Sequence, residues 1–187
     1  AAVAVSLIHL PYPLHVIVAL LAAMLAGMIW SLPVAFLKLG RGVHEVISTI
    51  MFNWIAHFFA FYLIANVLTD PKRGEKTISI AETSRLARIL PDTSLNYGLV
   101  VAVVAAVVVL FLLWRTTGGF ELRVSGFNPE AARYAGISRR RQILTAFLIG
   151  GATAGLAGAV QVMGRPPTYA LMSGLPQFVN LGFDGIG

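Results

Sequence analysis

The sequence contains no cysteine, so disulfide bonds and thiolate metal sites are excluded. Charge is scarce as well: 12% of the residues are Asp, Glu, Lys or Arg, whereas soluble domains typically contain about 25%. The glycine-rich phosphate loop Gly-x-x-x-x-Gly-Lys-Ser/Thr is also missing from the sequence. We therefore expect that this chain does not hydrolyse ATP by the usual route.

Groups of residues that perform chemistry are missing too. The four histidines, His9, His15, His44 and His57, are scattered through apolar segments without the spacing of a metal site. No arrangement of Ser, His and Asp indicates a nucleophilic triad. We expect no catalytic residue, no metal and no cofactor, and hence a protein that is not an enzyme.

Long apolar runs dominate what is present. Hydrophobic residues make up 57% of the chain, and the mean hydropathy is +0.79. Four runs reach the length that spans a bilayer, at residues 14–37, 43–68, 95–114 and 142–163. They predict an all-α polytopic membrane protein, a transmembrane helix bundle forming a single membrane domain over residues 1–187. The net charge of +6 lies in loops, which favours lipid headgroups over nucleic acid as a partner.

A polar stripe runs along the second of these helices. Its members recur every four residues, so they lie on one face of a helix. They are Glu45, Thr49, Asn53 and His57. Polar groups at membrane depth are costly unless they face protein or water. The stripe therefore predicts either contacts between helices or the lining of a solute path.

Small residues mark one face of the fourth helix. They are Gly151, Ala154, Gly155 and Gly158. Smooth faces of this kind let helix backbones approach closely in a membrane. We expect tight packing here, and a helix that slides during gating is the alternative.

A short capped helix is predicted at residues 128–135. Asn128 is a strong N-cap, and Pro129 suits the first helical position. Glu130 places negative charge near the positive end of the helix dipole. Gly136 supplies a residue that ends a helix in the left-handed conformation. Such a short helix is not stable alone in water, so something must pack against it.

The surroundings of this short helix are basic. The loop at residues 115–141 holds six arginines and two glutamates, the composition of a cytoplasmic loop. The loop at residues 69–94 has five Lys and Arg residues, and its segment 78–90 has the pattern of a short amphipathic helix. From physics alone, the capped helix either rests on lipid headgroups or binds another protein.

Four segments resemble one protein family. They are residues 117–137 with the motif Ser-Gly-Phe-Asn-Pro-Glu-Ala-Ala-Arg-Tyr-Ala-Gly, then residues 42–56, 151–159 and 182–186. In their order along the chain, these segments are similar to segments of the membrane permeases of bacterial ATP-binding-cassette (ABC) importers. The resemblance is to the branch that carries nucleosides and simple sugars, which is related to the ribose and branched-chain amino acid permeases.

The resemblance implies that the capped helix is a coupling helix, which docks on a separate ATPase subunit. It assigns this role to Gly126, Asn128, Pro129, Glu130, Ala131, Ala132, Arg133, Tyr134 and Gly136. Glu130 and Arg133 would then make charged contacts, and Tyr134 would be an apolar anchor. Ala131 and Ala132 would keep the surface narrow enough to enter a groove on the ATPase.

The resemblance also implies the setting and the partners. We expect a multi-pass protein of the bacterial plasma (inner) membrane, with residues 69–94 outside and 115–141 in the cytoplasm. The implied partners are an ABC ATPase, a second permease subunit in a homo- or heterodimer, and an extracytoplasmic solute-binding protein. The chain is expected to be a fragment of a larger permease, incomplete at both ends, with a broken helix after residue 163. A stand-alone secondary carrier or channel is the alternative.

Overall fold

The computed structural model describes residues 11–12, 14–41, 45–68, 77, 79–87, 89, 96–164 and 169. Four long helices account for most of them: α2 Leu14–Arg41, α3 Glu45–Asn66, α4 Gly98–Arg115 and α7 Arg139–Met163. Each is long and apolar enough to cross a membrane, by length and composition. The predicted all-α membrane fold is therefore confirmed, and within the described part of the chain there is no strand.

The ends of these helices lie close to the predicted ones. The largest difference is at α2, which continues to Arg41 instead of ending at residue 37. α4 begins three residues later than predicted and α7 three residues earlier, while α7 ends at residue 163 as predicted. The expected broken helix after residue 163 lies outside the described residues, apart from Gly164 and Tyr169.

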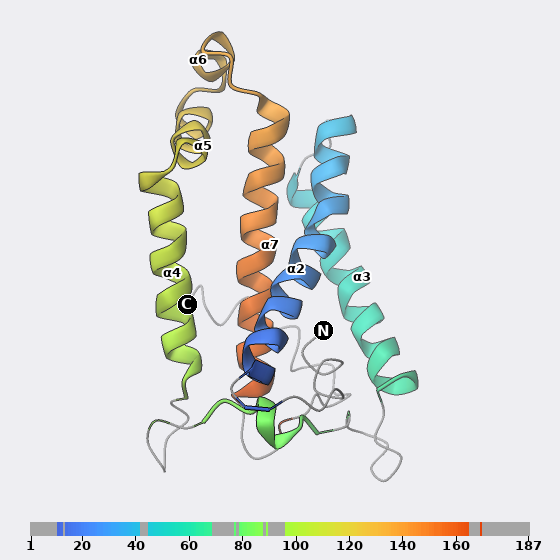
Figure 1. Ribbon diagram of the computed structural model, residues 1–187. Helices are drawn as coiled ribbons and strands as arrows, with labels where there is room; N and C mark the ends of the chain where they lie inside the picture. Colours follow the sequence, from blue (N-terminus) through green and yellow to red (C-terminus); the bar gives the residue numbers. More distant parts are fainter. Residues whose placement is uncertain are drawn as a thin grey trace, which may run out of the picture.

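The helices form an elongated bundle in which α7 is central (Figure 1). α2 runs antiparallel to α7 and makes the most extensive contact with it. α3 packs on α2, and α4 lies on the other side of α7. Two short helices, α5 Thr117–Phe127 and α6 Pro129–Tyr134, extend from one end of the bundle. The short 3-10 helix η1, Glu82–Ser84, lies at the opposite end.

The main hydrophobic core lies at the η1 end. Ile80 and Leu86, from the loop around η1, pack with Ala19 of α2 and with Ala159 and Met163 of α7. The backbone N–H of Leu86 donates to the carbonyl of Met163 (3.0 Å). Among the described residues of segment 78–90 the sole helical element is η1, so the expected amphipathic helix is not found there. The apolar side chains of this loop cover the ends of α2 and α7 instead of lying on a membrane surface.

Candidate functional site

The short helix α6 is held by caps at both of its ends. At the first end, Asn128 Oδ1 accepts hydrogen bonds from the N–H groups of Glu130 and Ala131, both at 3.0 Å. At the other end, Gly136 has a φ of +78°, the left-handed conformation that glycine adopts without strain. The N–H of Ile137 donates to the carbonyl of Ala132 (2.9 Å), which completes a Schellman motif. These caps satisfy backbone groups that a six-residue helix would otherwise leave unpaired.

The outward surface of α6 and of the residue before its cap is aromatic and charged. We call residues 127–134 the α6 tip; it forms one extreme end of the molecule (Figure 1). Phe127 and Tyr134 are each 91% exposed. Glu130 and Arg133 are exposed as well. The tip therefore presents two large apolar side chains that contribute little to the packing of this chain.

Phe127 was not singled out from the sequence. It stands immediately before the N-cap, where an apolar residue often packs on the fourth helical position, here Ala132. Its exposure means that it does not make this contact. The signal that could have identified Phe127 in the sequence is its place as an aromatic residue directly before a strong N-cap.

One residue of the predicted coupling surface faces the other way. Ala132 is 2% exposed and lines a pocket together with Gln142 and Ile143 of α7. The expectation that Ala132 shapes the outer surface is therefore wrong, whereas Ala131 is exposed as expected. The reason is packing: a helix this short needs one side against the rest of the chain, and Ala132 lies on that side.

A second helix, α5, supports α6 and was not predicted. Thr116 caps it, since its Oγ1 accepts from the N–H of Gly119 (3.1 Å). Gly119 is buried, and a side chain there would clash with the carbonyl of Leu112 in α4. Gly119 thus permits a sharp, close turn from α4 into α5.

A buried polar link joins α5 to α7. Gln142 Nε2 donates to Glu121 Oε2 at 2.6 Å, and Gln142 is 5% exposed. α6 contacts both α5 and α7. Any force applied to the α6 tip therefore reaches the long helix α7 through direct contacts.

Three glycines bring α7 and α2 close together. A side chain on Gly155 would clash with the carbonyl of Ala23, and one on Gly27 would clash with the carbonyl of Gly151. Gly151 and Gly155 thus lie in a close contact between helices, and Gly27 of α2 is a partner that the sequence analysis missed. Gly158 differs, because a side chain there would meet nothing within 4 Å.

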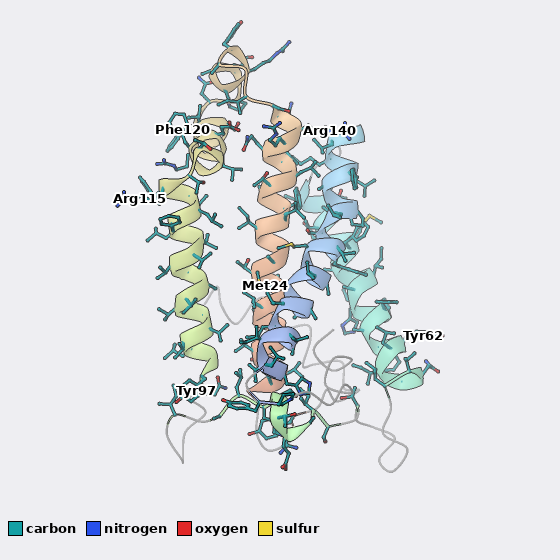
Figure 2. The ribbon with its side chains drawn as sticks, viewed as in Figure 1. Met24, Tyr62, Tyr97, Arg115, Phe120 and Arg140 are labelled. Carbon is teal, nitrogen blue, oxygen red and sulfur yellow. The ribbon has the colours of Figure 1, made fainter. Side chains whose placement is uncertain are left out.

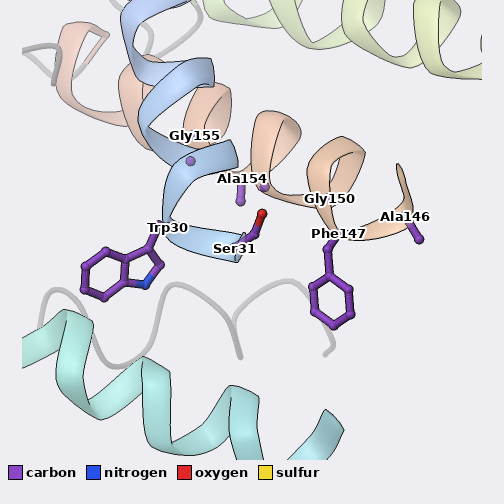
Figure 3. Close-up of a pocket in the computed structure, with 9 residues that line it drawn as sticks. Trp30, Ser31, Ala146, Phe147, Gly150, Ala154 and Gly155 are labelled. Atoms are coloured by element: carbon purple, nitrogen blue, oxygen red, sulfur yellow. The ribbon is translucent and has the colours of Figure 1, made fainter. Parts of the chain in front are cut away.

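The four small residues of α7 therefore do not form one packed face. Ala154 and Gly158 are exposed. Ala154 borders α2, because it lines the pocket beside this contact together with Gly27 and Ser31 (Figure 3). Gly158 meets open space, so the expected packing face is not found there. The close approach depends on Gly151 and Gly155 alone among the four.

A pocket of about 580 Å³ opens beside this contact. Figure 3 shows Ser31 between Trp30 of α2 and Phe147 of α7. The hydroxyl of Ser31 donates to the carbonyl of Met28 (2.8 Å), so its proton is already used within α2. No charged residue lines the pocket. It suits an apolar group better than a polar solute.

The polar stripe of α3 does not lie inside the bundle. Thr49 and Asn53 are exposed and His57 is partly buried, while the side chain of Glu45 lies outside the described residues. α3 packs on α2 through a different face, where Trp30 stacks on Phe59 (5.7 Å between ring centroids). Helix contacts within this chain thus do not account for Thr49 and Asn53, and their place along a solute path stays a prediction.

No group of three or more His, Cys, Asp and Glu residues that could hold a metal ion occurs in the described portion of the chain. Polar side chains of α5 and of the first turn of α7 meet in the hydrogen bond between Gln142 and Glu121.

Comparison with curated proteins gives relatives that are membrane permeases. The guanosine ABC transporter permease protein NupP of Bacillus subtilis (strain 168) is 44% identical over 181 residues, covering 94% of this chain and 51% of that protein. The nucleoside ABC transporter permease protein NupB of Lactococcus lactis subsp. cremoris (strain MG1363) is 30% identical over 192 residues, covering 98% of this chain and 52% of that protein. The glucose ABC transporter permease protein TsgB13 of Haloferax volcanii is 32% identical over 155 residues, covering 77% and 41% respectively.

The chain spans about half the length of the first two of these relatives. No solved structure matches it. The family described as branched-chain amino acid transport system / permease component matches residues 1–179, which is nearly the whole chain. Together with its four apolar helices, this match shows that the chain is a multi-pass membrane protein and belongs to that family of permease components.

Proposed function

We propose that this chain is part of the membrane-spanning subunit of an ATP-driven importer of nucleosides in the bacterial inner membrane. Two relatives that cover nearly all of this chain are named for guanosine and nucleoside transport. The relative named for glucose transport covers less of the chain, 77%. This comparison supports nucleosides over simple sugars as the solute.

The observation that supports ATP coupling best is the α6 tip. Phe127 and Tyr134 are each 91% exposed at one end of the molecule, although aromatic side chains gain most from being buried. Buried aromatic residues are the commonest anchors of protein interfaces. A groove on a separate ABC ATPase would bury both rings, with Glu130 and Arg133 at its rim.

Contacts within the chain offer a route for motion. α6 rests on α5 and α7, Gln142 links α7 to Glu121, and close glycine contacts join α7 to α2. ATP binding on the partner changes the membrane helices only if the tip contacts the two ATPase states differently. Movement of the tip would then reach α7 and α2 together.

The remaining partners follow from the same proposal. A second permease subunit, identical or different, completes the path, and an extracytoplasmic solute-binding protein delivers the nucleoside. The exposed polar groups of α3, Thr49 and Asn53, are proposed to face this path. A stand-alone carrier would leave the exposed aromatic rings of the α6 tip without a function.

Uptake by the whole transporter in proteoliposomes tests the proposal. We expect labelled guanosine to accumulate only when ATP is supplied on the side of the ATPase. Unlabelled nucleosides should compete with it, and glucose should not. Uptake that needs no ATP would contradict the proposal of an ATP-driven importer. Competition by glucose alone would contradict nucleosides as the solute.

A further inference from the structure

A polar pocket lies between α6 and the first turn of α7. It is enclosed by α5, α6, the first turn of α7 and Lys38 near the end of α2, and its volume is about 610 Å³. This volume is within the range of about 300–1,000 Å³ that is typical of small-molecule sites. The pocket therefore has room for a bound group.

The charge around the pocket is mainly positive. Lys38, Arg133 and Arg139 line it, and Glu130 is the one carboxylate among its lining residues. Neither Arg133 nor Arg139 makes an ion pair within the described residues. The lining therefore favours an anion.

The beginning of α7 adds to this preference. Arg139, Arg140 and Arg141 occupy its first turn, which contains no acidic residue, and the side chain of Ser138 makes no capping hydrogen bond. The positive end of a helix dipole is stabilised by negative charge and destabilised by cations. Three arginines at this position would be stabilised by an anion close to the first turn.

A buried polar residue, Gln142, also lines the pocket. Its Nε2 donates to Glu121. Its Oε1 is buried and has no hydrogen-bond partner in the described structure. A buried acceptor without a donor is costly. Because Oε1 has almost no accessible surface, Gln142 contributes to the pocket by holding α7 against α5 through its bond to Glu121.

The level of the pocket along the bundle identifies a source for this ligand. Figure 2 shows Arg115 and Arg140 near the ends of α4 and α7 that face α5. Trp114 is 63% exposed there, and Arg123 lies over its ring at 4.2 Å. Exposed tryptophan and clustered arginine are typical of the level of lipid headgroups. The half-buried Ile137 and Ile143 add apolar surface to the pocket.

We propose that this pocket binds the phosphate of the headgroup of an anionic phospholipid. The phosphate interacts with Lys38, Arg133 and Arg139. The bound headgroup fills the space between α6 and α7 from inside. This site does not depend on which solute the protein carries.

Lipid binding to the whole purified protein, measured by native mass spectrometry, tests this site. Phosphatidylglycerol is expected to bind more tightly than phosphatidylcholine, and Arg139→Gln is expected to weaken its binding about tenfold, the size of one lost charge-assisted hydrogen bond. Arg133→Gln should act in the same direction. The matched control is Arg140→Gln, because Arg140 lies in the same turn of α7 but does not line the pocket.

Two further ligands test whether the phosphate is the recognised group and whether it belongs to a lipid or to a soluble molecule. Phosphatidylmethanol carries the same phosphate charge without the glycerol, so it should bind about as tightly as phosphatidylglycerol, because the site recognises the phosphate. Release of the lipid by millimolar inorganic phosphate, with the same dependence on Arg139, would support a phosphate site and assign it a soluble ligand. Equal loss of binding in the Arg139→Gln and Arg140→Gln variants would overturn the site, because it would indicate diffuse attraction. Equal binding of phosphatidylglycerol and phosphatidylcholine would overturn it too.

Discussion

Gln142 in the first turn of α7 donates a hydrogen bond of 2.6 Å to Glu121 in the middle of α5. Gln142 is 5% exposed, so water competes weakly for this bond. The bond connects α5, which supports the α6 tip, to α7, the helix that makes the most extensive contact with α2.

We expect Glu121→Leu to lower the stability of the protein. The change removes the carboxylate and leaves the buried amide of Gln142 without its acceptor. Hydrogen bonds to charged groups contribute about 1.5–3 kcal/mol to the free energy of unfolding. Thermal unfolding of the purified protein measures the loss. Glu121→Gln retains an acceptor oxygen and should be closer to the parent; equal losses in both variants would mean that the hydrogen bond contributes little.

The exposed rings of the α6 tip give a second prediction. Phe127→Ala combined with Tyr134→Ala should reduce co-purification of the ATPase and abolish uptake, because two interface anchors are lost. Phe120→Ala is a suitable control, since Phe120 is 57% exposed but lies on α5 (Figure 2). Full retention of the ATPase by the double variant would show that the tip is not the docking surface.

The glycines of α7 form a matched pair for a third prediction. Gly151→Ala should destabilise the protein by about 1–3 kcal/mol, because the new methyl group meets the backbone of α2. Gly158→Ala has open space and should be neutral or stabilise by about 0.5–1 kcal/mol, since alanine favours a helix over glycine. Thermal unfolding of both variants is the measurement. The reverse order of stability would contradict the close contact at Gly151.

The polar stripe of α3 gives a fourth prediction. Asn53→Leu should impair nucleoside uptake while the transporter still assembles, if Asn53 faces the solute path. Asn66→Leu lies on the same helix outside the stripe, and Asn66 Nδ2 already donates to the carbonyl of Tyr62 (3.1 Å). It should leave uptake nearly unchanged. Normal uptake by the Asn53→Leu variant would assign the stripe to packing alone.

The orientation of the chain in the membrane can be tested with introduced cysteines, because the sequence has no cysteine of its own. Glu82→Cys places a thiol on η1, where the side chain is 87% exposed, and Glu130→Cys places one on α6. An impermeant thiol reagent should label the first from outside the cell and the second only from inside. Labelling of both from the same side would exclude the proposed orientation.

The sequence predicted the elements whose causes are local. Runs of apolar residues predicted the four long helices, and Asn128, Pro129 and Gly136 predicted the ends of α6 to within a residue or two. Features that depend on contacts between distant segments were missed. The inward position of Ala132 and the contact of Gly27 with α7 are set by neighbours ten or more residues away, which periodicity along one helix does not reveal.

The helix α5 was missed for a related reason. Gly119 is unfavourable in a helix by intrinsic propensity, so the segment resembled a loop. The close approach of α5 to the end of α4 requires that glycine, and tertiary packing outweighs its propensity. The polar stripe of α3 is a different case: Thr49 and Asn53 lie on an exposed face of α3, and their place along a solute path stays a prediction.

The main core of the described chain lies at the η1 end of the bundle, where Ile80 and Leu86 cover α2 and α7. If α2 and α7 tilt together about that end, the α6 tip, at the opposite end of the bundle, moves farthest (Figure 1). α7 has 25 residues, so the lever arm is about 37 Å long at about 1.5 Å per residue. A displacement of about 3 Å at the tip then corresponds to a rotation of only about 5° about the η1 end.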